Sequence, residues 1–320
     1  MAQLVAFRNA QGNLGLIQKD GNHVSYYVHT DQEFYKITGS NGWASWVGQV
    51  DAGYAEGCKE KITVESIRYY MNNYAETLSL DIVDFAEILN PGVYYPRIVR
   101  ENIQFDYVSE EFLQDARAFR NIQTSLDELF NYVEPSAANL AAYGHKIREL
   151  LILACTEVEC LLVKVLVDNG YPAKERYSTK DYVVCKSLLA LHEYEANLVQ
   201  YPSLKVFNPF LSWDSSSPTK SLPWYDAYNA VKHNRSDNIA DANLEHLLDA
   251  ISAIHILLES QYGRNIFNRW DGHTDDRSIF RTSRHPVWAC NEICAPLLIP
   301  GYSVKSQWTE KHKYFEDFPS

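Results

Sequence analysis

The chain has 320 residues, of which 46% are hydrophobic, and its formal net charge at pH 7 is -12. This length allows one large domain or two ordinary ones, each with a substantial core. The negative charge excludes a general nucleic-acid coat, because non-specific binding depends on Lys and Arg side chains that neutralise phosphates. Any nucleic-acid site must therefore be a local basic patch.

The sequence carries no sign of a membrane or export segment. No apolar run approaches the length that spans a bilayer, and the first residues, Met1 to Leu4, lack the basic and apolar regions of a signal peptide. We therefore expect a cytoplasmic protein whose six cysteines are reduced thiols. Cys155, Cys160 and Cys185 lie in apolar helical patterns, which predicts that they pack in the core.

Residues 1–95 form the first predicted domain. They begin with three apolar runs separated by turn residues, and Asp20-Gly21 between two of these runs is a hairpin signal, so we predict a small antiparallel β meander. Apolar residues from 63 to 89 favour helix, which Asn90-Pro91-Gly92 ends.

The second predicted domain, residues 105–263, has apolar residues at the three- and four-residue steps of helices that bury one face. One long helix is expected to start with Ser109 as its N-cap and to end at Pro135, and a second to run from Ser136 to Asn169. Two long helices joined by about three residues should be antiparallel neighbours.

Three shorter signals complete this domain. Ser178 with Asp181 forms a capping box for a third helix, and Pro223 suits the first turn of a short helix over 224–233. Asn238 is expected to cap a last long helix that Gly263 ends.

The third predicted region, the tail 264–320, has no sustained period but is too apolar for disorder, so we expect it to pack on the bundle. The predicted fold class is thus mainly α: a helical bundle with a small N-terminal antiparallel β meander and an irregular C-terminal extension.

Polar chemistry is densest in the short helix and just after it. Tyr228, Lys232 and Arg235 fall within about one turn of each other in pairs, and so do Asn229 and His233. The N-terminus of the following helix would add unpaired N–H groups and a positive dipole. One interpretation is an anion or phosphate pocket in which His233 transfers protons. The alternative is a solvated helix end with a structural Asn–His hydrogen bond.

This arrangement resembles the HEPN superfamily, whose nucleases carry an arginine, four to six intervening residues and a histidine, often as Arg-Asn-x-x-x-His. The segment Tyr228-Asn229-Ala230-Val231-Lys232-His233 matches that form at Asn229 and His233, and Tyr228 replaces the arginine. The longer motif Tyr-Asn-x-Val-Lys-His-x-Arg also looks like a variant found in bacterial proteins of this superfamily. The resemblance covers residues 105–263.

The resemblance implies a metal-independent ribonuclease whose Arg and His, from two protomers across a dimer cleft, activate the ribose hydroxyl and support the scissile phosphate. It implies that His233 is the acid or base, that Asn229 orients it, and that Lys232 or Arg235 binds the phosphate beside Tyr228. It further implies a homodimer without metal or cofactor, which binds RNA or a nucleotide. An antitoxin or a phage-defence protein would be its partner.

Two other functions stay open. A catalytically inactive dimerisation or partner-binding module is favoured by Tyr228, which cannot act as the bidentate cation of the motif. A metal-dependent enzyme would use the tail, where His285, Cys290 and Cys294 lie close in sequence and Asp271 to Asp276 look like a metal-binding loop. Buried thiols and ordinary turns explain the same tail residues. The polar face of the second long helix could line the cleft, but helix faces are normally charged, so we interpret it as mostly a solvated surface. Its residues are His145, Arg148, Glu149 and Glu157.

Overall fold

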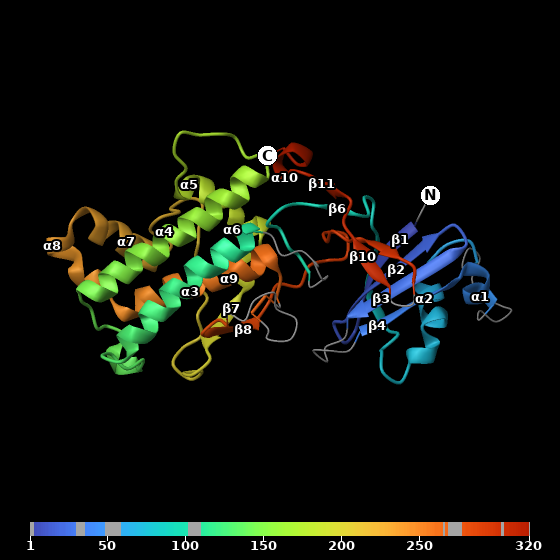
Figure 1. Cartoon of the computed structure of the whole chain (residues 1–320), viewed down its shortest axis with the longest axis horizontal. Coiled ribbons are helices and arrows are strands. Elements are labelled where there is room, and N and C mark those ends of the chain that lie inside the picture. Colours follow the sequence, from blue (N-terminus) through green and yellow to red (C-terminus); the bar gives the residue numbers. More distant parts are fainter. Residues whose placement is uncertain are drawn as a thin grey trace. The chain divides into compact units, whose positions relative to one another are not determined.

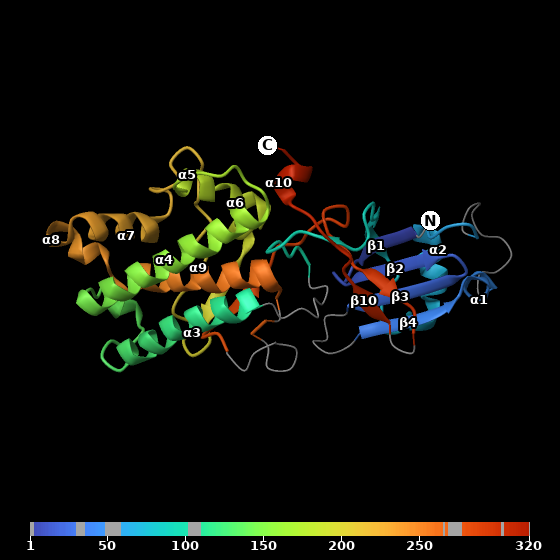
Figure 2. The ribbon, with the colours of Figure 1, turned by 45° about the horizontal axis from the view of Figure 1, so that its top comes forward.

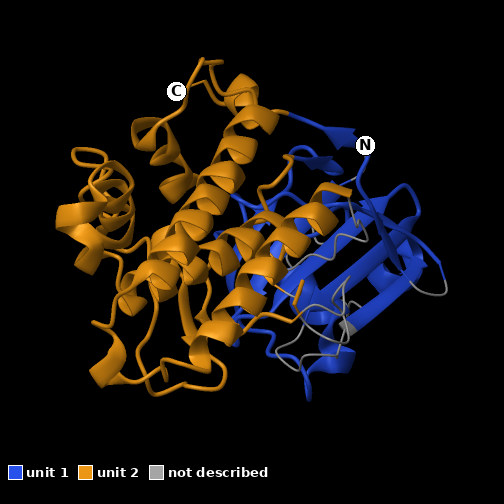
Figure 3. Ribbon diagram, turned by 60° about the vertical axis from the view of Figure 1, so that its left-hand side comes forward, with its two compact units in different colours: residues 1–94, 288–312 blue, residues 95–287, 313–320 orange. Residues whose placement is uncertain are grey.

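The computed structural model describes residues 3–29, 36–48, 59–101, 110–264, 266–267, 277–301 and 304–319 (Figure 1; turned by 45° in Figure 2). The chain divides into two compact units, which are coloured separately in Figure 3. Unit 1 comprises residues 1–94 and 288–312, and unit 2 comprises residues 95–287 and 313–320. Within the ranges above, no helix has the combination of length and apolar character needed to cross a bilayer.

Unit 1 is built on a five-stranded antiparallel sheet with the order β4-β3-β2-β1-β5. The pairing of β1, β2 and β3 confirms the predicted meander, because the turns fall where glycine and polar residues interrupt the apolar runs. The strands are β1 (Gln3–Asn9), β2 (Leu14–Asp20), β3 (His23–His29), β4 (Lys36–Gly42) and β5 (Ile82–Glu87).

Short helices add aromatic side chains to those that the strands contribute to the unit 1 core. The ring of Tyr26 lies 5.2 Å from that of Trp46 in α1 (Trp43–Gly48), and Trp46 lies 4.7 Å from Tyr70 in α2 (Val64–Tyr70). These rings pack with apolar strand residues in one buried cluster. The remaining elements of the unit are the 3-10 helix η1 (Asn72–Tyr74), β6 (Val93–Tyr94), β9 (Leu297–Ile299), β10 (Lys305–Gln307) and β11 (Glu310–Lys311).

The prediction of helix from 63 to 89 is wrong in its second half, where β5 forms. Its residues pair with β1 as the outermost strand, with Phe85 opposite Phe7 and Ala86 opposite Ala6. The apolar residues of this segment are compatible with helix or strand. The segment forms a strand because its backbone can then hydrogen-bond to the edge of β1.

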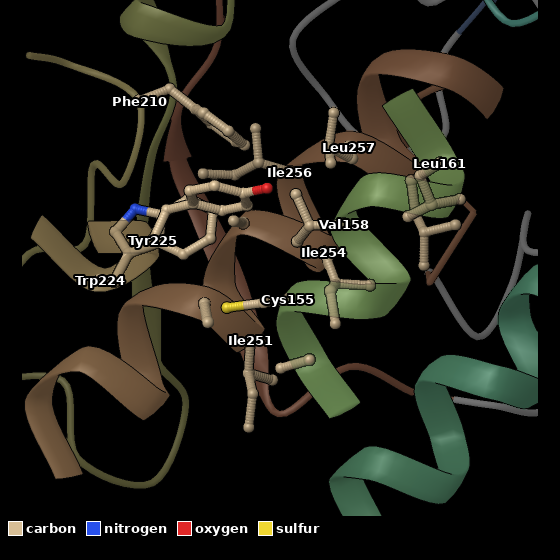
Figure 4. Close-up of a cluster of buried hydrophobic side chains, with 14 of the residues drawn as sticks. Cys155, Val158, Leu161, Phe210, Trp224, Tyr225, Ile251, Ile254, Ile256 and Leu257 are labelled. Atoms are coloured by element: carbon tan, nitrogen blue, oxygen red, sulfur yellow. The ribbon is translucent and has the colours of Figure 1, made fainter. Parts of the chain in front are cut away.

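Unit 2 contains four principal helices that pack around one large core. The helix α9 contacts α3, α4 and α7, and α3 lies beside α4, as the predicted antiparallel pair requires (Figure 1). These helices are α3 (Glu110–Phe130), α4 (His145–Asp168), α7 (Pro223–His233) and α9 (Leu244–Tyr262). Figure 4 shows side chains of α4, α7 and α9 converging in this core, among them Cys155, Trp224 and Ile251.

The other elements of unit 2 are short. The strands β7 (Glu195–Leu198) and β8 (Phe280–Arg284) pair with each other in antiparallel fashion. The rest are η2 (Ala137–Asn139), α5 (Thr179–Tyr182), α6 (Val184–Leu188), η3 (Leu191–Glu193), α8 (Arg235–Asn238), η4 (Ile239–Asp241) and α10 (Tyr314–Asp317).

Several predicted helix ends need correction. The second long helix begins at His145 rather than Ser136, because the intervening segment forms η2 and a loop. The last long helix is capped by Asn243, whose side-chain oxygen accepts the backbone N–H of His246 at 2.9 Å, and not by Asn238. The capping box of Ser178 and Asp181 is confirmed, but its helix breaks between α5 and α6. Ser109 lies outside the described residues.

The predicted mainly α class is wrong: 42% of the described residues are helical and 20% are in strands, so the fold is mixed. The tail accounts for part of this difference. Its strand β8 pairs with β7 in unit 2, whereas residues 288–312 belong to unit 1 and include β9, β10 and β11. A strand of two to five residues leaves too little periodicity in the sequence to be recognised, since tertiary pairing creates it.

The cysteine prediction holds for two of the three helical thiols. Cys155 and Cys185 are buried in unit 2, but Cys160 is exposed on α4. Its place in the apolar pattern was misleading, because Cys160 falls on the solvent side of the helix.

Candidate functional site

The motif helix α7 begins with Pro223 in its first turn, as expected, and its apolar face is buried against the core of unit 2. Tyr228 belongs to this buried face, with only 1% of its surface exposed. Its hydroxyl accepts a hydrogen bond of 2.7 Å from Nζ of Lys232, which also lies 4.8 Å from the centre of the Tyr228 ring. Tyr228 therefore anchors Lys232 and does not itself face solvent.

Lys232 stays cationic in this position. Its hydrogen bond to Tyr228 is the main reason why the pKa of Lys232 lies above its ordinary value, and the nearby carboxylate of Glu159 adds to the effect. Glu159 in turn accepts a hydrogen bond from the hydroxyl of Tyr225. Burial and this carboxylate raise the pKa of Tyr225, so its hydroxyl remains protonated.

Asn229 does not bond to His233. Its amide Nδ2 donates to the backbone carbonyl of Tyr225 at 3.1 Å, one turn earlier in the same helix. The Asn229 side chain is half-buried, whereas His233 is exposed at the last position of α7. The structure thus places both residues on one short helix without joining them.

The helix breaks between His233 and Arg235. Asn234 has non-helical backbone angles (φ -139°, ψ 84°), and Arg235 begins the short helix α8. Both His233 and Arg235 are exposed, and within the described residues neither side chain forms a hydrogen bond or an ion pair. An imidazole and a guanidinium that are available to a ligand therefore lie on either side of one non-helical residue.

A third cation reaches the same place from α4. The guanidinium of Arg148 donates to the backbone carbonyl of Val231 through Nε at 3.3 Å and Nη2 at 3.1 Å. These bonds tie the first turn of α4 to the last turn of α7, at the left of Figure 1. The interpretation of Arg148 as part of a solvated surface misses this contact, and nothing in the sequence indicates it, because Arg148 and Val231 are 83 positions apart.

We call the group formed by Arg148, Lys232, His233 and Arg235 the cationic end of unit 2. Its members come from the start of α4, the end of α7 and the start of α8. Together they can bind an anion, and His233 can give or accept a proton at an exposed position.

A second polar cluster of unit 2 lies under β8. Glu259 of α9 is buried, yet Nε2 of His285 lies 3.3 Å from its Oε2 and Nε2 of His255 lies 3.7 Å from its Oε1. The hydroxyl of Thr282 donates to Oε2 of Glu259, and Nε2 of His255 lies 2.9 Å from the same hydroxyl oxygen. The i,i+4 spacing of His255 and Glu259 is visible in the sequence, but only the fold brings Thr282 and His285 to them.

This cluster holds a carboxylate in its charged form away from water. Burial raises the pKa of Glu259, but the imidazoles of His255 and His285 and the Thr282 hydroxyl outweigh that effect, so the pKa lies below its ordinary value. Burial lowers the pKa of His255, which therefore stays neutral near pH 7.

Of the tail residues considered for a metal, the three that the structure describes fall in different units. His285 belongs to unit 2 and contacts Glu259, whereas Cys290 and Cys294 belong to unit 1. Residues 271–276 lie outside the described ranges. Among the residues that the structure describes, no group of His, Cys, Asp and Glu is arranged to hold a metal ion.

The geometry of unit 2 thus offers an exposed histidine among cations and a buried carboxylate network. Comparison with known proteins adds no assignment: no family model, no curated protein and no solved structure matches this chain.

Proposed function

We propose that unit 2 acts on RNA as a HEPN-like, metal-independent ribonuclease and binds the RNA backbone at its cationic end. The observation that carries the proposal is the exposed His233, flanked by Lys232 and Arg235 and close in the chain to the carbonyl that Arg148 binds. The net charge of the chain is -12, so this group of cations is a local positive region on a protein that is negatively charged overall. Local cations are what a phosphate backbone requires.

The proposed chemistry uses side chains of the protein, the RNA and water. His233 takes the proton of a ribose 2′-hydroxyl, the 2′-oxygen bonds to the adjacent phosphorus, and the bond from phosphorus to the 5′-oxygen breaks. The leaving 5′-oxygen takes a proton from water. Lys232 and Arg235 stabilise the charge that develops on the phosphate oxygens. A second copy of the chain would bring a second His233 to the cleft, and the protein is proposed to work as a homodimer.

One feature favours a second candidate, an RNA-binding or partner-binding module that does not cleave. Tyr228 is buried, and the Asn229 amide is bonded to the Tyr225 carbonyl, so neither side chain orients His233. An unoriented imidazole contributes less to proton transfer, because catalytic groups work best when they are held in place. In a toxin-antitoxin or phage-defence setting, such a module would hold RNA or a partner protein.

The test measures binding and cleavage of a labelled single-stranded RNA in the presence of EDTA. We expect His233→Ala to lower the cleavage rate about 10²-fold or more and to leave affinity nearly unchanged, since general acid–base catalysis contributes on that order. Arg235→Ala should weaken binding about fivefold at 0.1 M salt and make the salt dependence shallower by about 0.7, as expected for one lost phosphate contact on a single strand.

Arg117→Ala is the matched control, because Arg117 is an exposed arginine of α3 near Asp115. Asp115 pairs with Lys164 in the last turns of α4, far from the cationic end. Failure of the wild-type protein to bind RNA at low salt would refute the proposal. Binding without cleavage in both wild type and His233→Ala would select the second candidate.

A further inference from the structure

We infer that Arg148 is a phosphate-binding residue of this site, fixed in place by the end of the motif helix. The inference rests on the function proposed above and adds a residue that lies outside the sequence motif. Its basis is the pair of hydrogen bonds from Nε and Nη2 of Arg148 to the carbonyl oxygen of Val231.

These bonds hold the guanidinium at the C-terminal end of α7, close in the chain to His233. Val231 precedes His233 by two residues, so their Cα atoms are at most about 7 Å apart. Because two donors of Arg148 share one acceptor, the edge of the guanidinium that faces the Val231 carbonyl is defined and not only its position. Half-buried Arg148 is therefore oriented before any ligand arrives.

Donors of Arg148 remain available for a ligand. A guanidinium has five N–H groups. The bonds to Val231 use one on Nε and one on Nη2, and in the described part of the chain nothing accepts a hydrogen bond from Nη1. Arg235 offers the same chemistry without such fixation, since it has no partner among the described residues. Arg148 is thus the better-ordered guanidinium of the two.

The contact between Arg148 and Val231 also changes the local charge that an approaching phosphate encounters. The break at Asn234 leaves the Val231 carbonyl at the C-terminal end of α7, where unsatisfied carbonyl groups carry partial negative charge. That carbonyl would repel an anion next to His233. Arg148 covers it and replaces a repulsive group with a positive charge.

A purely structural role would use the same two bonds, because a cation that caps a helix C-terminus stabilises the helix. Arg148→Gln separates the two roles. A glutamine amide can still donate to the Val231 carbonyl, but it carries no charge. Arg148→Lys keeps the charge, and Arg117→Gln makes the same chemical change in α3 at the other end of α4.

The experiment measures RNA affinity as a function of salt for the full chain, together with the thermal unfolding temperature of each variant. We expect Arg148→Gln to unfold near the wild-type temperature, to bind about fivefold more weakly at 0.1 M salt, and to have a salt dependence shallower by about 0.7. Arg148→Lys and Arg117→Gln should keep the wild-type salt dependence.

An unchanged salt dependence in Arg148→Gln overturns the inference, and the proposed function stands if Arg235→Ala still reduces that dependence. If Arg148→Gln unfolds early, the salt dependence is measured at a temperature at which that variant is still folded, with Arg148→Lys as the charged comparison. A dependence shallower by about 0.7 in the glutamine variant alone supports a charge contact, and equal dependences in the two variants contradict it. Absence of RNA binding by the wild type refutes the proposed function instead.

Discussion

Glu259 illustrates how single residues of unit 2 depend on partners that are distant in sequence. Its carboxylate is buried under β8 and keeps its charge only because His255, Thr282 and His285 surround it. Removing one of the groups that pair with a buried carboxylate typically lowers the free energy of unfolding by about 3–5 kcal/mol, because the carboxylate then stays buried without a partner for its charge. The cluster therefore makes the position of β8 on α9 specific.

The same residues predict a loss of stability in acid. The pKa of His255 is lowered by burial from its ordinary value of 6.5, so the unfolded chain binds a proton more readily and the free energy of unfolding falls as the pH drops below about 6.5. Glu259 has a lowered pKa, so its contribution is present above the ordinary value of 4.5 and is lost as the pH falls through the folded value. Thermal unfolding measured from pH 7.5 to 5.5 should show the decrease in stability that is due to His255.

His255→Phe provides the comparison, because the ring of His255 already stacks on Phe267 at 5.1 Å and phenylalanine does not titrate. We expect its unfolding temperature to depend less on pH in this range than that of the wild type. Equal pH dependence in His255→Phe and wild type would contradict the assignment.

Within the elements of unit 1, an aromatic ring covers a glycine on the neighbouring strand. Phe7 of β1 lies directly opposite Gly15 of β2, and a Cβ atom added at Gly15 would lie 2.2 Å from Cζ of the Phe7 ring. Phe7 is fully buried and cannot move aside. Tyr26 covers Gly39 in the same way across β3 and β4.

Gly15→Ala should therefore destabilise unit 1 by about 1–3 kcal/mol, the usual cost of overpacking a core. The measurement is chemical unfolding of the full chain followed by tryptophan fluorescence, in which Trp43 and Trp46 report on unit 1 and Trp213 and Trp224 on unit 2. Gly48→Ala is the control, because nothing lies within 4 Å of a Cβ atom at that position. An equal effect of both substitutions would show that glycine flexibility, and not the Phe7 ring, sets the cost.

At the start of α9, the observed N-cap gives a second prediction for an element. Asn243→Ala should destabilise unit 2 by about 1 kcal/mol, because it leaves the backbone N–H of His246 without its side-chain acceptor. Asn238→Ala should cost less, since the Asn238 amide only donates to carbonyls of Ala230 and Asn234 near α8. Thermal unfolding of both variants tests the order, and a larger effect of Asn238→Ala would contradict the assigned cap.

At the scale of the whole molecule, the chain passes between the two units three times, after residues 94, 287 and 312. Each unit has its own buried cluster, so the effects of Gly15→Ala and Asn243→Ala should appear in different units. The candidate RNA site belongs wholly to unit 2.

The sequence by itself determined the features that depend on neighbours in the chain. The meander turns at Asp20-Gly21, the buried stripes of α3, α4 and α9, the capping box at Ser178 and the end of α9 at Gly263 all follow from local geometry and periodicity. The same local spacing singled out Lys232, His233 and Arg235 as a polar group at the end of α7.

Only the tertiary structure decided the features that depend on distant partners. It made 82–87 a strand by pairing it with β1, shared the tail between two units, and brought Arg148 to Val231 and His285 to Glu259. The physical reason is that periodicity records which face of an element is buried but not what buries it. A strand edge, a helix-end carbonyl or a buried carboxylate is satisfied by whichever donor the fold delivers.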